Sequence, residues 1–283
     1  MKASNAIATF FKYFVLILVG LIMIYPLLWM VSATFKDNSE IFAGIGLWIK
    51  NPTLEGYKNA LNNFGGSINI LQAMLNTYSY VIPKVICTVV SACIAAYGFG
   101  RFDFPGRKLL FNIMLATLFL PQVVLNVPQF LLYTKFGWVN SPFYLAIWVH
   151  TAFATETYFV YQLVQFMRNV PRDLDEAAAI DGCNSFQTLY KVIVPMLMPA
   201  LVSCALFQFM WSCNDFMGPL LYVQTPAKYP MSLFVKLSMD GDTGFAWNRI
   251  LALSLISILP QLIVFFCAQD QFVEGISAGA VKG

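Results

Sequence analysis

Ionisable side chains interrupt the long apolar stretches of this sequence at four positions, Lys84, His150, Glu156 and Asp215. If those stretches cross a bilayer, a charge near its centre costs about 2.5–3.5 kcal/mol on insertion scales, so such residues usually face a cavity or a partner. The two carboxylates could then bind a polar solute or carry protons. Structural roles stay open: Lys84 could extend to the interface, His150 could hydrogen-bond to a neighbouring helix, and Glu156 could form a salt bridge.

A second polar cluster lies in the segment Pro171–Pro195, between two apolar stretches. Asp173, Asp175 and Glu176 follow Pro171, and a leading proline with early acidic residues favours the N-terminus of a helix. Gly182 predicts the end of that helix. We therefore expect a short helix followed by a glycine turn.

The rest of this segment predicts a second short helix. Asn184 or Ser185 suits its first position. An apolar stripe with helical spacing follows at Phe186, Leu189, Tyr190 and Ile193. We expect Pro195 to end the unit at the membrane. From the residues alone, the segment is either an amphipathic helix on lipid headgroups or a docking surface for a partner, and the small Ala177 and Ala178 would allow close approach.

The composition indicates an integral membrane protein. Of 283 residues, 59% are hydrophobic and 11% are charged, and the mean hydropathy is +0.67. A soluble domain carries about 25% charged residues. The net charge of +3 is too small to suggest nucleic-acid binding. The first apolar run is long and has no small-residue cleavage site behind it, so we expect a retained anchor rather than a signal peptide.

Metal, cofactor and catalytic sites are not expected. The six cysteines form no Cys-x-x-Cys pair, and His150 is the single histidine. Zinc sites normally need four such ligands at short spacings. We therefore expect inert, buried thiols, and no enzymatic activity in this chain.

Six stretches are long enough to span a bilayer, which takes about 20 largely apolar residues. An all-α membrane fold follows, because lipid tolerates only helices or closed barrels and these runs do not alternate as barrel strands do. We expect residues 1–283 to form a single transmembrane domain. The expected spans are residues 14–33, 71–98, 109–133, 142–167, 196–223 and 250–268.

The charges of the short loops set the expected orientation. Arg101, Arg107 and Lys108 lie in one loop, and Arg168 and Arg172 lie in another. Basic residues in short loops favour the cytoplasmic side. Both termini and the 171–195 segment are therefore expected in the cytoplasm. The two long segments on the other side, residues 34–70 and 224–249, are either docking surfaces or plain connectors.

The 171–195 segment resembles the coupling loop of permease subunits of ATP-binding-cassette (ABC) importers. It has Glu-Ala-Ala at 176–178, Gly182 after three more residues, and Pro195 after a further twelve. Within that class the chain is similar to the carbohydrate branch, specifically to the second permease subunit of maltose-type importers. Further matching stretches are residues 25–36, 95–106, 121–141, 211–220, 272–275 and 279–283.

The resemblance implies a type I importer fold of six helices with a cytoplasmic coupling helix, in a bacterial-type inner membrane. It implies that cytosolic ATPase subunits contact Glu176, Ala177, Ala178, Asp181, Gly182 and Pro195. The implied partners are a second related permease, a dimeric ATPase, an external solute-binding protein and a sugar, most naturally an oligosaccharide. The chain has no Gly-x-x-x-x-Gly-Lys-Ser/Thr loop, so ATP and Mg²⁺ are expected on the ATPase.

The resemblance also suggests a substrate pathway through Glu156, Asn214, Asp215 and Trp211. Glu156 could bind sugar hydroxyls, and Trp211 could stack on sugar rings or pack in the core. Asn214 and Asp215 could line a cavity or stabilise a helix break. The main rival function is a proton- or ion-coupled secondary transporter, with Glu156 and Asp215 as proton sites. A membrane-embedded enzyme is the weaker rival.

Overall fold

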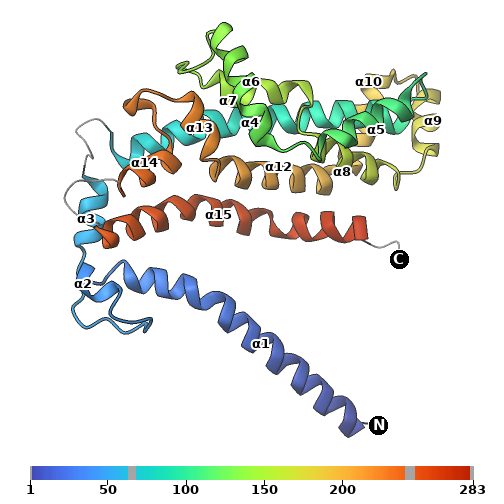
Figure 1. The fold of residues 1–283 in the computed structure, drawn as a ribbon. Helices are drawn as coiled ribbons and strands as arrows, with labels where there is room; N and C mark the ends of the chain where they lie inside the picture. The colour runs from blue at the N-terminus through green and yellow to red at the C-terminus, as the bar shows by residue number, and fades with distance from the viewer. Residues whose placement is uncertain (1, 63–67, 240–245, 281–283) are drawn as a thin grey trace. The chain divides into compact units, whose positions relative to one another are not determined.

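The computed structural model describes residues 2–62, 68–239 and 246–280, with side chains at 9–62, 68–239 and 246–271. Every regular element of this part is a helix, as expected (Figure 1). The C-terminal stretches singled out in the sequence, 272–275 and 279–283, lie outside the described side chains. Parts of the two long connecting segments, 63–67 and 240–245, also lie outside the described residues.

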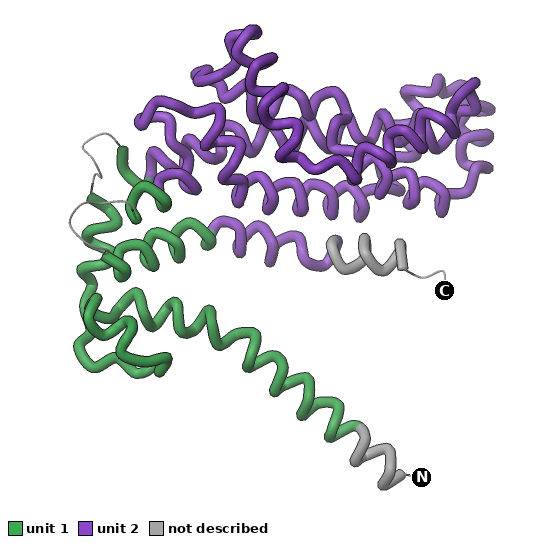
Figure 2. The backbone as a smooth tube through the Cα atoms, in the orientation of Figure 1, with its two compact units in different colours: residues 1–70, 235–259 green, residues 71–234, 260–283 purple. Residues whose placement is uncertain are grey.

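The chain divides into two compact units (Figure 2). Unit 1 comprises residues 1–70 and 235–259, and unit 2 comprises residues 71–234 and 260–283. The first elements are α1 (Lys2–Ala33), α2 (Asn38–Ile41), α3 (Glu55–Leu61) and α4 (Ile70–Arg101). The last are α14 (Met231–Leu237) and α15 (Trp247–Ala280).

In unit 1 the segment after α1 folds back through polar contacts. Lys36 is 2% exposed, and its Nζ donates to the carbonyl of Gly46 at 2.6 Å. Ser32 Oγ donates to Leu47 O at 2.6 Å. At Gly56 a Cβ atom would lie 2.7 Å from the carbonyl oxygen of Asn248, so this glycine allows α3 to meet the start of α15.

Unit 2 holds the candidate sites. Its elements up to the loop are α5 (Arg107–Thr117), α6 (Gln122–Lys135), α7 (Leu145–Trp148), the 3₁₀ helix η1 (Val149–Phe153), α8 (Thr157–Met167) and α9 (Asp173–Ile180). They continue as α10 (Ser185–Thr188), the π-helical η2 (Leu189–Ile193), α11 (Val194–Met196), α12 (Met198–Cys213), α13 (Met217–Tyr222) and the 3₁₀ helix η3 (Pro226–Lys228).

Two apolar clusters hold this unit together. One buries α4, α8 and α12 against each other through residues such as Ala96, Leu163 and Cys204. The other gathers aromatic residues such as Tyr80, Tyr133 and Tyr222. Together the two clusters fix α4, α8 and α12, the three helices that border the polar features described below.

Three helices of the described residues are continuous, long and apolar enough to cross a membrane: Thr9–Ala33, Ile70–Arg101 and Trp247–Gln271. They correspond to the first, second and sixth expected spans. Two bent pairs would raise the number to five. One pair is α5 with α6, bent by 98°, and the other joins residues 185–196 to α12 with a 79° bend.

The third, fourth and fifth expected spans are interrupted. The third breaks at residues 118–121, where Pro121 precedes α6, and α6 continues through Pro128. The fourth is divided into α7, η1 and α8, because Tyr144 and Ala154 have positive φ angles of 53° and 54°. The fifth ends α12 at Cys213 and resumes as α13.

The cysteines are not uniformly buried. Cys93, Cys204 and Cys213 are buried, Cys87 and Cys183 are half-buried, and Cys267 is exposed in this chain. The expectation of buried thiols therefore holds for three of the six.

Candidate functional site

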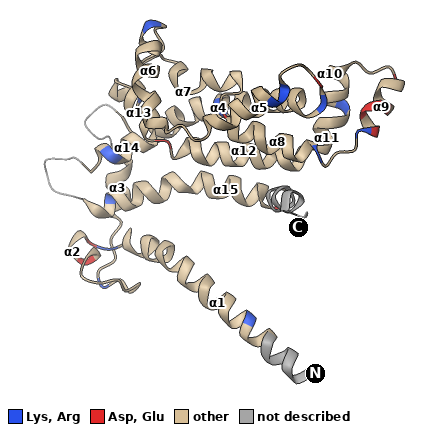
Figure 3. Ribbon diagram, turned by 45° about the vertical axis from the view of Figure 1, so that its right-hand side comes forward, with Lys and Arg blue, Asp and Glu red and all other residues tan. Residues whose placement is uncertain are grey.

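The first candidate site is the loop of residues 171–195. The expected pair of short helices is present as α9 and α10, and Figures 1 and 3 place both at one end of unit 2, with acidic residues on α9. Asp173, Asp175 and Glu176 occupy the first turn of α9. Their negative charge faces the partial positive charge of the helix N-terminus, which stabilises the helix.

The turn after α9 depends on Gly182. Its φ is +77°, a left-handed conformation that glycine adopts at little cost. The N–H groups of Gly182 and Cys183 donate to the carbonyls of Ala179 and Ala178 at 3.1 and 2.9 Å. These bonds satisfy the end of α9. Asp181 precedes the turn and is exposed.

A capping box starts α10. Asn184 Oδ1 accepts from the N–H of Gln187, and Gln187 Oε1 accepts from the N–H of Asn184, both at 2.9 Å. Of the two candidates from the sequence, Asn184 is therefore the cap. Pro195 lies inside α11 rather than ending the unit, which closes at Leu197.

The expected apolar stripe is split between two environments. Leu189 and Ile193 are buried in the α4–α8–α12 cluster. Phe186 and Tyr190 are 68% and 53% exposed, and their rings are 6.1 Å apart. Leu189 and Ile193 both belong to the π-helical turn η2, whereas Phe186 precedes it in α10. The exposed pair leaves an aromatic patch on the loop.

The Glu-Ala-Ala triplet is likewise divided. Ala178 is buried, whereas Glu176 and Ala177 are exposed. Ile180 is 87% exposed. The outer face of α9 therefore offers a carboxylate, a small side chain and an aliphatic side chain to whatever covers it.

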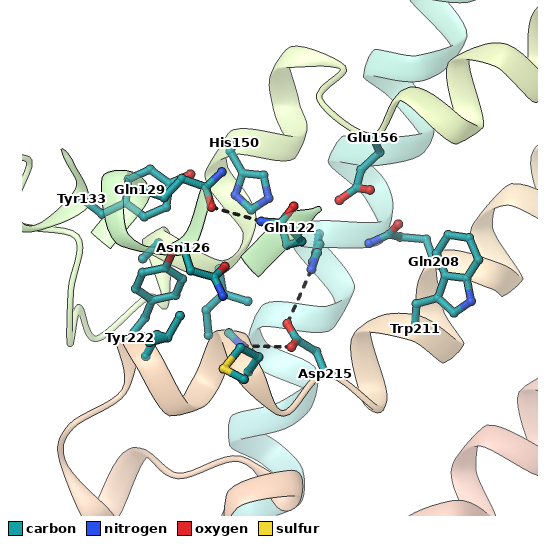
Figure 4. Close-up of a pocket in the computed structure, with 16 residues that line it drawn as sticks. Gln122, Asn126, Gln129, Tyr133, His150, Glu156, Gln208, Trp211, Asp215 and Tyr222 are labelled. Atoms are coloured by element: carbon teal, nitrogen blue, oxygen red, sulfur yellow. Dashed lines mark hydrogen bonds and ion pairs between the residues drawn. The ribbon is translucent and has the colours of Figure 1, made fainter. Parts of the chain in front are cut away.

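The second candidate site is a cavity of about 360 Å³ inside unit 2 (Figure 4). Its lining is rich in polar and aromatic side chains. The residues that Figure 4 labels are Gln122, Asn126, Gln129, Tyr133, His150, Glu156, Gln208, Trp211, Asp215 and Tyr222. Lys84 also lines it. Three of the four expected pathway residues, Glu156, Trp211 and Asp215, are among them.

An ion pair crosses this cavity. Lys84 Nζ lies 4.0 Å from Asp215 Oδ2, and the two side chains are 12% and 26% exposed. Asp215 Oδ1 accepts from the N–H of Gly218 at 3.0 Å, which caps the start of α13. Asp215 therefore both lines the cavity and stabilises the helix break. The Lys84 ammonium therefore faces Asp215 at the cavity.

Of the two roles expected for Asn214, cavity lining and stabilisation of a helix break, its contacts fit the second. Its Nδ2 donates to Met210 O at 2.8 Å and to Gln261 Oε1 at 3.1 Å. It is not among the residues that line the cavity. The side chain ends α12 and connects it to α15.

Two polar atoms at the cavity have no hydrogen-bond partner among the described residues: His150 Nδ1 and Gln208 Oε1. Gln208 is 2% exposed, and its Nε2 donates to Ser212 Oγ at 3.0 Å. Buried polar atoms normally find partners. Both atoms line the cavity, where a hydroxyl-bearing solute or water could satisfy them.

Trp211 combines the two expected possibilities. Its ring packs 5.5 Å from Tyr158, 5.3 Å from Phe159 and 5.8 Å from Phe207. It is nevertheless 49% exposed and lines the cavity. One part of the indole is held in the core while another part stays accessible to a solute.

Sequence reasoning missed the polar stripe of α6. Gln122, Asn126, Gln129 and Tyr133 are spaced i, i+4, i+7 and i+11 and all line the cavity. Gln122 Nε2 donates to Gln129 Oε1 at 3.2 Å. Polar residues that recur at helical spacing in an otherwise apolar helix were the available signal.

Comparisons with known proteins agree on one family. The family described as "Binding-protein-dependent transport system inner membrane component" matches residues 88–274. GgtD of Synechocystis, an osmoprotective compounds uptake permease, is 34% identical over 226 residues, covering 78% of this chain and 75% of GgtD. MalG of Thermococcus litoralis, a trehalose/maltose transport permease, is 31% identical over 267 residues, covering 94% of each chain.

A solved structure shares the fold. It is a bacterial ABC transporter involved in the import of the acidic polysaccharide alginate, and one of its chains is 20% identical with a TM-score of 0.79. The similarity covers 95% of this chain and 98% of that chain.

Proposed function

This chain belongs to the family of binding-protein-dependent transport system inner membrane components, and on that premise we propose that it is a permease subunit of an ATP-driven oligosaccharide importer. The family expected from the sequence is thereby confirmed. Members of it are transport components rather than enzymes. The sugar substrate is supported by MalG, whose transport system is named for trehalose and maltose.

The cavity of unit 2 is the observation that carries the substrate proposal. It joins amide, carboxylate, ammonium and imidazole groups to aromatic rings inside an apolar unit. Amides and carboxylates exchange hydrogen bonds with sugar hydroxyls, and ring faces cover the apolar faces of sugars. Ligand sites commonly have this combination of apolar walls and a few convergent polar groups. The volume of about 360 Å³ suits one or two sugar units, with the rest of the path supplied by a second permease.

The proposed membrane arrangement has six spans, with both termini and the 171–195 loop in the cytoplasm. Three continuous helices and the bent pair of α5 with α6 account for four of the spans, and α12 with α13 would be the fifth, because residues 185–195 of the second bent pair belong to the loop. The broken segment α7–η1–α8 would be the sixth. Irregular backbone is tolerated at membrane depth where it lines a cavity, and His150 and Glu156 of this segment line one here. The whole chain would act as one permease domain.

The loop would couple the permease to a cytosolic ATPase dimer that binds ATP and Mg²⁺. The proposed contacts are the exposed residues Glu176, Ala177, Asp181, Gly182 and Pro195, whereas Ala178 is buried and packs inward. Support comes from the exposed outer face of α9 and from the aromatic patch of Phe186 and Tyr190. ATP binding would close the ATPases, the loop would move with them, and the cavity would open toward a docked solute-binding protein.

The test is to solubilise native membranes in mild detergent, isolate this chain and assay ATP hydrolysis. The expected complex contains a second permease and a pair of ATPases. We expect a solute-binding protein loaded with its sugar to stimulate hydrolysis, and the sugar that stimulates identifies the substrate. Isolation of the chain alone, with uptake driven by a proton gradient, would overturn the proposal in favour of a secondary transporter.

A further inference from the structure

The end of α4 meets the 171–195 loop at Arg101. This arginine is the last residue of α4, and its side chain is 7% exposed. Its Nε lies 3.2 Å from Asp175 Oδ2, in the first turn of α9. Its Nη2 donates to the carbonyl of Val170 at 3.0 Å. One guanidinium group therefore holds both the entry to α9 and α9 itself.

Arginine suits this position because its donors form a rigid planar fork. A lysine would present a single ammonium group and could not reproduce both contacts in the same geometry. Asp175 is 25% exposed, so the pair is much less hydrated than an ordinary surface ion pair. Arg172 lines the same small cavity as Arg101 and Asp175 but is exposed.

The middle of the same helix reaches the polar cavity of unit 2, because Lys84 lines that cavity. Lys84 and Arg101 are 17 positions apart, which corresponds to about 26 Å of α-helix. Pro83 is the one proline inside α4, and it lies next to Lys84. Since proline removes a backbone hydrogen bond, helices bend at such positions. The part of α4 that follows Pro83 therefore has an ion pair at each end, Lys84–Asp215 at its start and Arg101–Asp175 at its end.

We propose that Arg101 is the positioning residue through which movement of α9 is transmitted to α4 and so to the Lys84–Asp215 pair in the cavity. The inference rests on the proposed function, because it assigns the internal path of the same coupling. The clamp on Val170 and Asp175 makes α9 and the lower part of α4 move together. Without it, α9 could follow the ATPase while α4 stays behind, and ATP would be hydrolysed without transport.

The experiment uses the complete complex isolated from membranes and reconstituted in vesicles, with wild-type, Arg101→Ala and Asp175→Asn chains. Three quantities are measured: recovery of the ATPase subunits, ATP hydrolysis, and sugar uptake per ATP hydrolysed. Arg107→Ala is the matched control. Arg107 pairs with Asp103 in the neighbouring loop, but that pair is i,i+4 and its side chains are 30% and 79% exposed. Such exposed pairs contribute little.

We expect Arg101→Ala to keep ATPase recovery and basal hydrolysis while uptake per ATP falls at least tenfold. Asp175→Asn should lower the same ratio several-fold, because the neutral amide keeps the shape but loses the charge. The double variant should be no worse than Arg101→Ala alone, since both changes break one link. Arg107→Ala should match the wild type.

Three results would overturn the inference. They are an unchanged ratio in Arg101→Ala, strictly additive effects in the double variant, and loss of the ATPase subunits together with uptake, which is the pattern of a purely structural role. A wild-type complex that takes up sugar without ATP would instead overturn the proposed function, and the inference with it.

Discussion

Single residues determine the geometry of both candidate sites. Gly182 permits the left-handed turn after α9, and Gly218 permits the close approach of Asp215 to the start of α13. The residue type alone did not show that either glycine has a role that the other glycines of the chain lack. Gly182 could be singled out from the sequence because it ends an expected helix, whereas the role of Gly218 appears only when Asp215 is placed beside it.

Replacement of Gly182 tests the turn. A side chain at φ +77° costs about 1–2 kcal/mol and is worst for a β-branched residue, while asparagine tolerates this conformation. We expect Gly182→Val to leave membrane insertion intact, to lower recovery of the ATPase subunits, and to reduce uptake more than tenfold. Gly182→Asn should keep most of the uptake. Equal uptake in the two variants would contradict a need for this turn.

Replacement of Gly218 tests the ion pair of the cavity. A Cβ atom at 218 would lie 2.5 Å from Asp215 Oδ2, so the carboxylate must move. We expect Gly218→Ala to lower uptake about fivefold to tenfold while ATPase recovery stays normal. Gly98→Ala in α4 is the control, because a Cβ there meets no atom within 4 Å. Wild-type uptake in Gly218→Ala would show that the position of Asp215 is unimportant.

At the scale of elements, α9 and α6 each use one face for function and another for packing. On α9, Ala178 packs inward while Glu176 is exposed. On α6, polar residues line the cavity, while Val123 and Val127 are 74% and 68% exposed in this chain. A helix whose two faces differ in this way can be tested one face at a time.

Charge reversal on α9 separates the proposed contact from helix stability. Glu176 and Asp173 both lie in the first turn of α9. A lysine at either position would therefore reduce the stability of the helix by a similar amount, about 0.3–1 kcal/mol. We expect Glu176→Lys to abolish uptake and weaken ATPase association, measured by pulldown, and Asp173→Lys to have a much smaller effect. Similar losses in both variants would point to helix stability instead of a specific contact.

The polar stripe of α6 predicts a defined loss on substitution. Asn126→Leu removes a group that can hydrogen-bond to a solute, which is worth about 1 kcal/mol, or about fivefold in affinity. We expect weaker sugar affinity with unchanged membrane insertion, measured as the concentration dependence of uptake. Thr134→Leu is the control, because Thr134 is a polar residue of α6 outside the cavity lining. If both variants behave alike, α6 does not bind the solute.

At the scale of the whole molecule, charge is concentrated in loops and at helix ends. Figure 3 shows few charged residues along the helices of either unit. The long apolar surface of α1 is exposed in this chain, for example at Leu21 with 61%. Such a surface needs lipid or another subunit around it.

The proposed orientation predicts the accessibility of cysteines to a membrane-impermeant maleimide. Lys50 is exposed in the segment between α2 and α3, and Cys183 is half-buried in the 171–195 loop. We expect Lys50→Cys to react in intact cells and Cys183 to react only after permeabilisation. Comparison with a Cys183→Ser chain identifies the part of the labelling that comes from Cys183 in the loop. The opposite pattern would reverse the orientation and place the loop away from any cytosolic ATPase.

The sequence by itself determined the class of fold, the family and the two short helices of the loop. These depend on local properties: long apolar runs, acidic residues and proline at a helix start, and glycine at its end. Of the four residues expected on a substrate pathway, Glu156, Trp211 and Asp215 line the cavity of unit 2, and Asn214 does not.

Only the tertiary structure decided which residues meet. The breaks at Tyr144 and Ala154 depend on backbone angles that no composition predicts. The pairs Lys84–Asp215 and Arg101–Asp175 join residues 131 and 74 positions apart. Leu189 and Ile193 pack into the α4–α8–α12 cluster, while Phe186 and Tyr190 of the same stripe stay exposed. The physical reason is the same in each case: the environment of a side chain is set by packing between segments that are far apart in the sequence, and the local sequence does not encode which of these segments will meet.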